Sequence, residues 1–184
     1  MGFQQRRRAR PAGEAPPQAD GPDADPMEVA REIALRILTM RDHSRQELGD
    51  KLAAKDVPED TIVELLDRFE EVGLLNDENF AQQWTRARRN SRKLSRAAVR
   101  RELQTKGVDR DLIEDTLSGI GHEDEVELAT VLAQKKWRQV QNLPREVAYR
   151  RMAGALARKG YSSSVVAEVV RSVMQGEDPA PEPW

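Results

Sequence analysis

The sequence predicts an all-α protein built from three tandem three-helix repeats that stack along the chain. One pattern occurs three times, as Leu52–Val57, Leu103–Val108 and Leu156–Tyr161, at spacings of 51 and 53 residues. A fixed period of this size indicates copies of one helical unit. Apolar residues recur three and four positions apart, and no run shows the sustained alternation that is typical of a strand. Such stacks usually present a long surface to another macromolecule.

Composition excludes several classes of protein. Of the 184 residues, 34% are charged, 4% are aromatic and none is Cys, and the mean hydropathy is -0.74. We therefore expect no disulfide or thiolate metal site, no membrane span and no secretory signal, which together predict a soluble intracellular protein. Residues 1–26 and 175–184 offer almost nothing apolar to bury, so we expect both to be disordered tails.

Residues 27–76 predict the first repeat, which is acidic. Apolar positions spaced three and four apart predict a helix over 27–40. Ser44 and Glu47 have the spacing of a capping box, which begins the second helix. Gly73 is placed to end the third helix.

Residues 77–121 predict a second, basic repeat on the same plan. Asp77 is the expected cap of its first helix and Ser95 the expected cap of the next. Gly107 follows the second helix as a terminator, and Asp109 is placed to cap the third helix.

Residues 122–174 predict a third repeat, also basic. Its middle helix is expected to begin at Pro144 and to end at Gly160. Either Ser162 or Ser163 is expected to cap the last helix, which is rich in Val.

A Lys-Gly pair follows the middle helix of the second and third repeats, and Asp56 replaces the glycine in the first. Glycine adopts the left-handed conformation just past a helix end, and lysine complements the negative end of the helix dipole. This local explanation accounts for the lysines, and contact with a partner is their alternative role.

The chain offers no recognisable catalytic or metal site. Its two histidines, His43 and His122, have no metal-ligand spacing, and its glycines are placed as helix ends and linkers rather than as a phosphate-binding loop. The carboxylates lie in polar stretches, with little apolar surrounding to raise a pKa. We expect no enzymatic activity, no cofactor and no bound metal.

Charge is distributed in blocks of alternating sign. The net charge is -7 over residues 27–78, +8 over 79–110, -7 over 111–129 and +7 over 130–174. The overall charge of -2 hides these blocks. Local fields, and not the average charge, are what a phosphate backbone meets.

The strongest functional signal is a run from Asn79 to Arg101 with eight basic residues and no acidic one. Like charges repel one another unless a polyanion or an acidic protein surface meets them. We predict that this run and a second cluster in the third repeat bind such a partner. The predicted filament- or DNA-binding residues are Arg86, Arg88, Arg89, Arg92, Lys93, Arg96, Arg100, Arg101, Lys135, Lys136, Arg138, Arg150, Arg151, Arg158 and Lys159. Trp84 is expected in the core, so base stacking is not predicted.

Three motifs lie in order on the repeats. They are Arg41–Leu48 with Lys51 and Leu52, Gly73–Asp77 with Phe80, Ala81, Trp84 and Arg88, and Glu102–Leu103 with Lys106 and Gly107. Together they resemble the signature of the RecX regulatory proteins, over about residues 27–174. The chain departs from the family at Leu94–Ser95, where glycine is common, and at Pro144, where the Ser-Arg pair is missing.

The resemblance implies a bacterial cytoplasmic protein that binds the RecA recombinase filament and modulates recombination in DNA repair, mostly by inhibition. It also implies nine helices in three modules, curved to lie along the filament groove. The leading hypothesis is therefore a monomeric, non-enzymatic modulator of the RecA–DNA filament. We expect it to bind single- and double-stranded DNA weakly and without sequence preference.

Two other hypotheses remain open. The chain has the features of a helix-turn-helix-like DNA-binding transcription regulator, with Ser95–Lys106 as the recognition helix. No heptad seam provides the dimer symmetry that such regulators use. A scaffold for an unrelated protein is the third hypothesis, and it predicts affinity for neither DNA nor RecA.

Overall fold

The computed structural model describes residues 25–176, and within them every regular element is a helix. The elements are α1 (Pro26–Leu38), α2 (Arg45–Ala53), α3 (Glu59–Glu71), α4 (Asp77–Ala87), the π-helix η1 (Arg88–Arg92), α5 (Arg96–Thr105), α6 (Arg110–Leu117), α7 (His122–Val140), α8 (Arg145–Arg158) and α9 (Ser163–Gln175). The predicted all-α class is confirmed. The predicted tails, 1–26 and 175–184, lie almost entirely outside the described residues.

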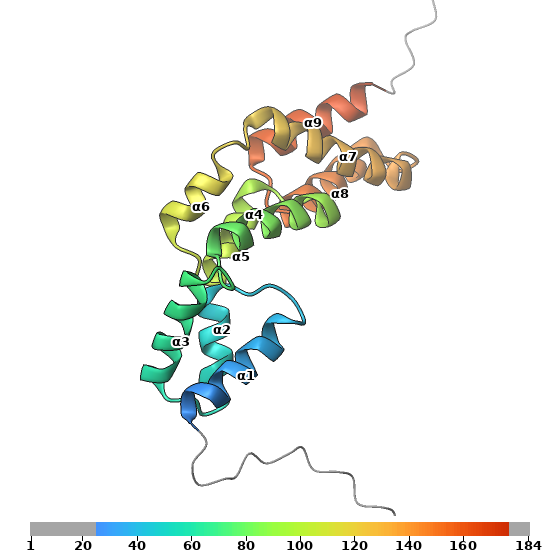
Figure 1. The fold of residues 1–184 in the computed structure, drawn as a ribbon. Helices are drawn as coiled ribbons and strands as arrows, with labels where there is room; N and C mark the ends of the chain where they lie inside the picture. Colours follow the sequence, from blue (N-terminus) through green and yellow to red (C-terminus); the bar gives the residue numbers. More distant parts are fainter. Residues whose placement is uncertain (1–24, 177–184) are drawn as a thin grey trace, which may run out of the picture.

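The helices form three repeats that follow one another along a bent path, with α1 and α9 at opposite ends (Figure 1). Repeat 1 contains α1–α3, repeat 2 contains α4–α6 with η1, and repeat 3 contains α7–α9. Each repeat has its own cluster of buried apolar side chains. Leu48 and Leu52, Val99 and Leu103, and Met152 and Leu156 are the buried residues that recur in the middle helices. The predicted tandem repeats therefore have three separate small cores, one in each repeat.

Most predicted helix caps are confirmed, and one is wrong. Ser44, Ser95 and Ser162 each accept a hydrogen bond from the backbone amide three residues later. The cap of α4 is Asn76, whose side chain accepts from the Asn79 amide at 2.8 Å. Asp77 is instead the first residue of α4. Its carboxylate accepts a hydrogen bond from the Arg45 amide of repeat 1, as described below.

The Lys-Gly turn has the left-handed geometry that the sequence predicts. Gly107 and Gly160 follow α5 and α8 with φ of +71° and +88°. Asp56 adopts φ of +62° at the same position after α2. Asp tolerates this region better than most residues with a Cβ, although at some conformational cost.

The same turn joins successive repeats. At joint 1, between repeats 1 and 2, the Ser44 hydroxyl donates to the Lys106 carbonyl at 2.5 Å. At joint 2, between repeats 2 and 3, the Ser95 amide donates to the Lys159 carbonyl at 3.1 Å. In both cases the Lys-Gly turn of one repeat docks on the serine N-cap of the repeat before it. The helix cap therefore also holds the stack together.

A second bond recurs at each joint. The first amide of the middle helix, that of Arg45 or Arg96, donates to a carboxylate near the start of the next repeat. The acceptor is Asp77 at 2.8 Å in joint 1 and Glu125 at 3.0 Å in joint 2. Helix N-termini favour negative charge, so this arrangement stabilises both partners. Burial raises the pKa of Asp77, and the hydrogen bond from Arg45 only partly offsets this.

The two ends of the stack lack the docking residues. Asp56 stands in place of glycine in repeat 1, the first of the three described repeats. In repeat 3, α8 begins earlier than its counterparts, and Ala148 occupies the position of the cap serine inside the helix. Ala148 has no hydroxyl, and its amide already donates to the Pro144 carbonyl at 3.0 Å, so neither of the groups that receive a turn at joints 1 and 2 is available at this position.

The π-helix η1 was not predicted from the sequence. It widens the last turn of α4 and ends at Lys93, which has φ of +53°. The Lys93 carbonyl accepts a hydrogen bond from the Tyr161 hydroxyl of repeat 3 at 3.0 Å. This contact turns the chain towards α5 and adds a third bond to joint 2.

Replacing Gly160 by Ala should destabilise the protein. An alanine there would have to keep the left-handed backbone conformation. Its Cβ would also lie 2.7 Å from the Ser95 hydroxyl oxygen and 2.8 Å from the Ala98 Cβ. We expect a loss of about 2 kcal/mol or more in the free energy of unfolding, measured by urea denaturation. Gly119→Ala is the matched control, because no heavy atom lies within 4 Å of its added Cβ. Equal stability of the two variants would contradict the joint described here.

Candidate nucleic-acid interface

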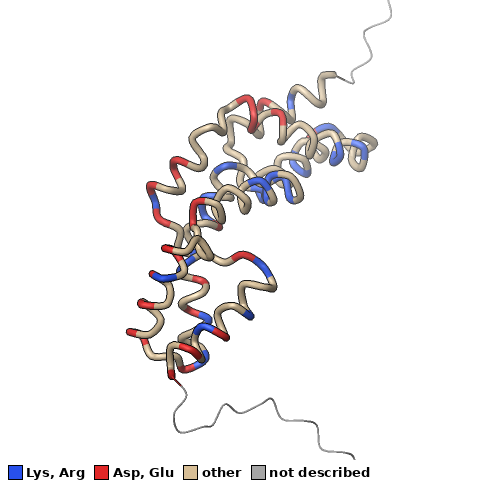
Figure 2. The backbone as a smooth tube through the Cα atoms, viewed as in Figure 1, with Lys and Arg blue, Asp and Glu red and all other residues tan. Residues whose placement is uncertain are grey.

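The predicted binding residues lie on α4, η1, α5, α7 and α8, and two of them, Lys93 and Lys159, directly follow η1 and α8. Figure 2 shows Lys and Arg gathered from the end of α4 through η1, along α8 and at the far end of α7, whereas Asp and Glu are concentrated along α6 and at the start of α7. The blocks of charge along the sequence therefore become separate surfaces in the folded chain.

Four of the predicted residues are partnered by acidic residues of neighbouring helices. The ion pairs are Arg88–Glu102 at 2.7 Å, Arg89–Glu125 at 2.7 Å, Arg100–Glu114 at 2.6 Å and Arg96–Glu114 at 3.7 Å. The Arg89 and Glu125 side chains are each only 14% exposed. The repulsion expected within the basic run is thus partly relieved inside the molecule. These ion pairs join η1 to α5 and to α7, and α5 to α6.

The other eleven predicted residues form what we call the basic surface. None of them has an ion-pair partner among the described residues, and Lys136 has one polar contact, to Gln139 at 3.2 Å. Most of these side chains are exposed, and Lys93, Lys136 and Lys159 are half-buried. The basic surface consists of Arg86, Arg92, Lys93, Arg101, Lys135, Lys136, Arg138, Arg150, Arg151, Arg158 and Lys159.

Trp84 is half-buried, and its ring is already engaged. The Arg88 guanidinium lies 3.7 Å from the ring centroid and the Lys106 ammonium 3.9 Å. Its Nε1 donates to Glu102 at 2.9 Å, and the Phe80 ring stacks on it at 5.7 Å between centroids. Cations over an indole ring gain electrostatic stabilisation. Trp84 therefore binds side chains of this chain, in keeping with the expectation that it is not a base-stacking residue.

A groove of about 560 Å³ runs beside Trp84 and is lined by residues from all three repeats. Glu47 comes from α2, Arg101 and Glu102 from α5, and Arg158 from α8. Lys106, which follows α5, lies between them. The sequence did not predict this groove, because its walls meet only when the repeats dock.

Glu47 is the central acidic group of joint 1. It accepts from Lys106 at 2.6 Å and from Arg41 at 3.3 Å, so its predicted capping role towards Ser44 is replaced by these contacts. Burial opposes ionisation of the carboxyl, but the hydrogen bonds from Arg41 and Lys106 outweigh it and lower the pKa of Glu47 to about 2. Glu47 is therefore ionised at neutral pH and neutralises Lys106.

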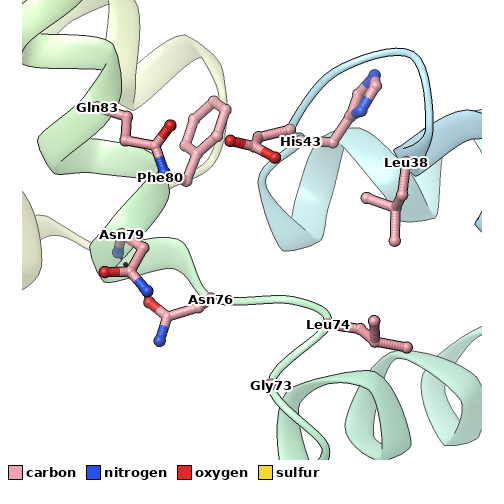
Figure 3. Close-up of a pocket in the computed structure, with 9 residues that line it drawn as sticks. Leu38, His43, Gly73, Leu74, Asn76, Asn79, Phe80 and Gln83 are labelled. Carbon is pink, nitrogen blue, oxygen red and sulfur yellow. Dashed lines mark hydrogen bonds between the residues drawn. The ribbon is translucent and has the colours of Figure 1, made fainter.

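His43 has a structural role. It lies beside a pocket of about 150 Å³ between the α1–α2 loop, the turn at Gly73 and Leu74, and the start of α4 at Asn79 and Phe80 (Figure 3). The His43 ring is buried, and its Nδ1 lies 2.8 Å from the Arg41 carbonyl. Burial lowers the pKa of His43, so the neutral ring donates to that carbonyl at neutral pH.

The described residues contain no group of three or more His, Asp or Glu side chains that could hold a metal ion. His122 is exposed and contacts Glu168 at 3.0 Å. None of the described helices has both the length and the apolar character needed to cross a bilayer.

Comparison with known proteins matches each repeat to a known domain. Residues 30–69, 76–117 and 123–170 match, in this order, the first, second and third three-helix domains of RecX. The chain is 46% identical over 159 residues to the regulatory protein RecX of Streptomyces lividans, a match that covers 85% of each chain. It is 40% identical over 164 residues to the regulatory protein RecX of Mycobacterium avium, covering 88% of this chain and 93% of that one.

Solved structures show the same fold. The crystal structure of RecX from Lactobacillus salivarius superposes with a TM-score of 0.72 at 24% identity, covering 80% of this chain and 96% of that one. A second crystal structure of a regulatory protein RecX has a TM-score of 0.70 at 27% identity, covering 80% of this chain and 72% of that one.

Glu47 should make stability depend on pH. The pKa of Glu47 in the folded protein, about 2, is below the usual 4.5. Its contribution to the free energy of unfolding is therefore fully present above pH 4.5 and is lost as pH falls towards 2. We expect Glu47→Gln to lower the free energy of unfolding by about 1–3 kcal/mol near neutral pH and the difference to shrink in acid. Urea denaturation of both proteins at several pH values, from neutral to acid, measures this difference. The control is Glu127→Gln, at an exposed position, and a pH-independent effect of Glu47→Gln would refute the assignment.

Proposed function

Because the chain belongs to the RecX family of regulatory proteins, we propose that it is a non-enzymatic regulator of the RecA recombinase–DNA filament. It binds the filament and modulates, mostly inhibits, the ATPase, recombination and strand-exchange activities of RecA. The observation that carries the proposal is the basic surface, whose eleven cations lack acidic partners among the described residues and extend over two repeats of a bent stack. A long filament offers a partner of matching length and charge.

The distribution of charge supports binding to a protein–DNA filament over binding to naked DNA. The basic surface suits phosphates or an acidic recombinase surface, whereas repeat 1 and residues 111–129 are acidic and repel phosphates. Contact with recombinase also contributes hydrogen bonds and buried apolar surface, which add to the binding energy from electrostatic attraction. We therefore expect tight binding to the filament and weak, steeply salt-dependent binding to DNA alone.

We further propose that the regulator acts as a cytoplasmic monomer. Both joints are formed within one chain, and the ends of the stack lack the residues that dock one repeat on another. Asp56 and Ala148 stand at these ends. A second copy would therefore find no equivalent docking site.

The alternative, a helix-turn-helix-like transcription regulator, has less support. Its recognition helix would be α5, but the N-terminus of α5 is covered by repeat 3 through Ser95, Ala98 and the Arg96 amide. Arg96 and Arg100 are also engaged with Glu114. Recognition helices usually contact bases with their N-terminal residues, and these are the residues that the fold uses internally.

The proposal is tested by adding the purified protein to RecA on single-stranded DNA. At an equimolar ratio we expect reduced DNA-dependent ATP hydrolysis and reduced strand exchange. Unchanged rates of both reactions would overturn the proposal. A gel-shift comparison of random and genomic duplexes addresses the alternative, because a strong sequence preference would favour transcriptional regulation.

Charge reversal locates the surface. We expect Arg86, Arg92, Arg150 and Arg151, all changed to Glu, to weaken filament binding at least about tenfold, because unpaired cations are replaced by charges that repel phosphate. The measurement is co-sedimentation with RecA on single-stranded DNA, with circular dichroism to check folding. The matched control reverses four exposed, unpaired cations elsewhere, namely Arg31, Lys51, Lys55 and Arg110. Equal losses in the two variants would mean that only net charge matters.

A further inference from the structure

The two joints share a backbone arrangement but differ in charge. At joint 1 the Lys106 ammonium is neutralised by Glu47 at 2.6 Å. By the repeat spacing, the counterparts at joint 2 are Lys159 and Ala98. An alanine has no carboxylate, and Lys159 has no ion-pair partner among the described residues. The lysine of the docked turn is therefore neutralised at joint 1 and has no acidic partner at joint 2.

The groove beside Trp84 leads from joint 1 to joint 2. Its two acidic residues are occupied, Glu47 by Lys106 and Arg41, and Glu102 by Arg88 and the Trp84 indole. Its two remaining cations, Arg101 and Arg158, are exposed and have no side-chain partner among the described residues. The wall near joint 2 thus offers two free guanidinium groups.

These two groups come from different repeats and border the same turn. Arg101 lies on α5 and reaches the docked Lys-Gly turn, because a Cβ at Gly160 would lie 3.0 Å from its Nη2. Arg158 is the last residue of α8, immediately before that turn. The arrangement exists only when repeat 3 is docked on repeat 2.

We propose that this end of the groove binds the phosphodiester backbone of nucleic acid, with Arg101 and Arg158 each contacting a phosphate. Guanidinium groups present several donors in a plane that matches phosphate oxygens. The proposal rests on the proposed function in one respect, since the strand within the recombinase filament is the natural source of this backbone.

The groove recognises the backbone and not the bases. The Trp84 ring is the aromatic group in its wall, and it is contacted by Arg88, Lys106 and Phe80. A base would stack there only by displacing one of these groups. Stacking is the usual source of base contact in single-strand binding, so we expect affinity to be independent of base identity.

The test measures binding of Arg101→Gln/Arg158→Gln to oligothymidylate and to an abasic phosphodiester strand of the same length, at several salt concentrations. Two lost phosphate contacts should reduce the slope of log affinity against log salt by roughly 1.4, at about 0.7 per contact on single strands. The matched control is Arg31→Gln/Arg110→Gln, which removes the same charge at exposed positions outside the groove. Wild-type protein should bind the two strands within about twofold of each other, as expected for backbone recognition.

Three results would overturn the proposal: an unchanged slope in the groove variant, an equal slope change in the control, or much tighter binding of oligothymidylate than of the abasic strand. Urea denaturation of both variants keeps a folding defect from being read as lost binding. The RecA ATPase assay with wild-type protein separates the two proposals. Inhibition together with an unchanged slope refutes the groove alone, whereas a reduced slope without any effect on RecA refutes the regulatory function alone.

Discussion

The docking of a Lys-Gly turn on a serine N-cap is the interaction on which the rest of the structure depends. Each repeat has a small core of its own, and among residues 25–176 the buried apolar side chains form separate clusters, one per repeat. Small cores stabilise a fold weakly, so stacked units rely on the contacts between neighbours. Those contacts here include hydrogen bonds at both joints, through Ser44 and Ser95 and through the acceptors Asp77 and Glu125. Polar bonds are directional, which sets the angle between repeats more tightly than apolar contact alone.

The joints also divide the arginines into two groups with different roles. Arg88, Arg89 and Arg100 are held by carboxylates of other helices, so removing one of them leaves a half-buried acid without its partner. The basic surface consists of cations that the fold does not use. Changes in the first group are expected to alter stability, and changes in the second to alter binding. A binding defect is therefore informative only when the altered residue is exposed and unpaired.

Much of the fold could be predicted from the sequence, because its signals are local. A helix period, a cap or a terminating glycine is visible within a few residues, and the threefold pattern shows how the units follow one another. The partners of the basic run could not be predicted in this way. Glu102 and Glu125 are 14 and 36 residues away from the arginines they bind, and Glu47 is 59 residues from Lys106. Asp77 was likewise misassigned as a cap, because its acceptor role depends on a helix 32 residues earlier.

The buried Ala148 has a consequence for how such a chain evolves. Tandem arrays usually lengthen by duplication of one unit, and each new unit needs a neighbour that can receive it. Here a unit copied onto the C-terminal end would meet a continuous helix, in which Ala148 has no hydroxyl and its amide is already bonded to the Pro144 carbonyl. Duplication at this end would yield a tethered domain and not a longer stack. Extension of the stack at this end would therefore require both a helix start and a serine at position 148, because the amide and the hydroxyl are the two groups that receive a turn at the existing joints.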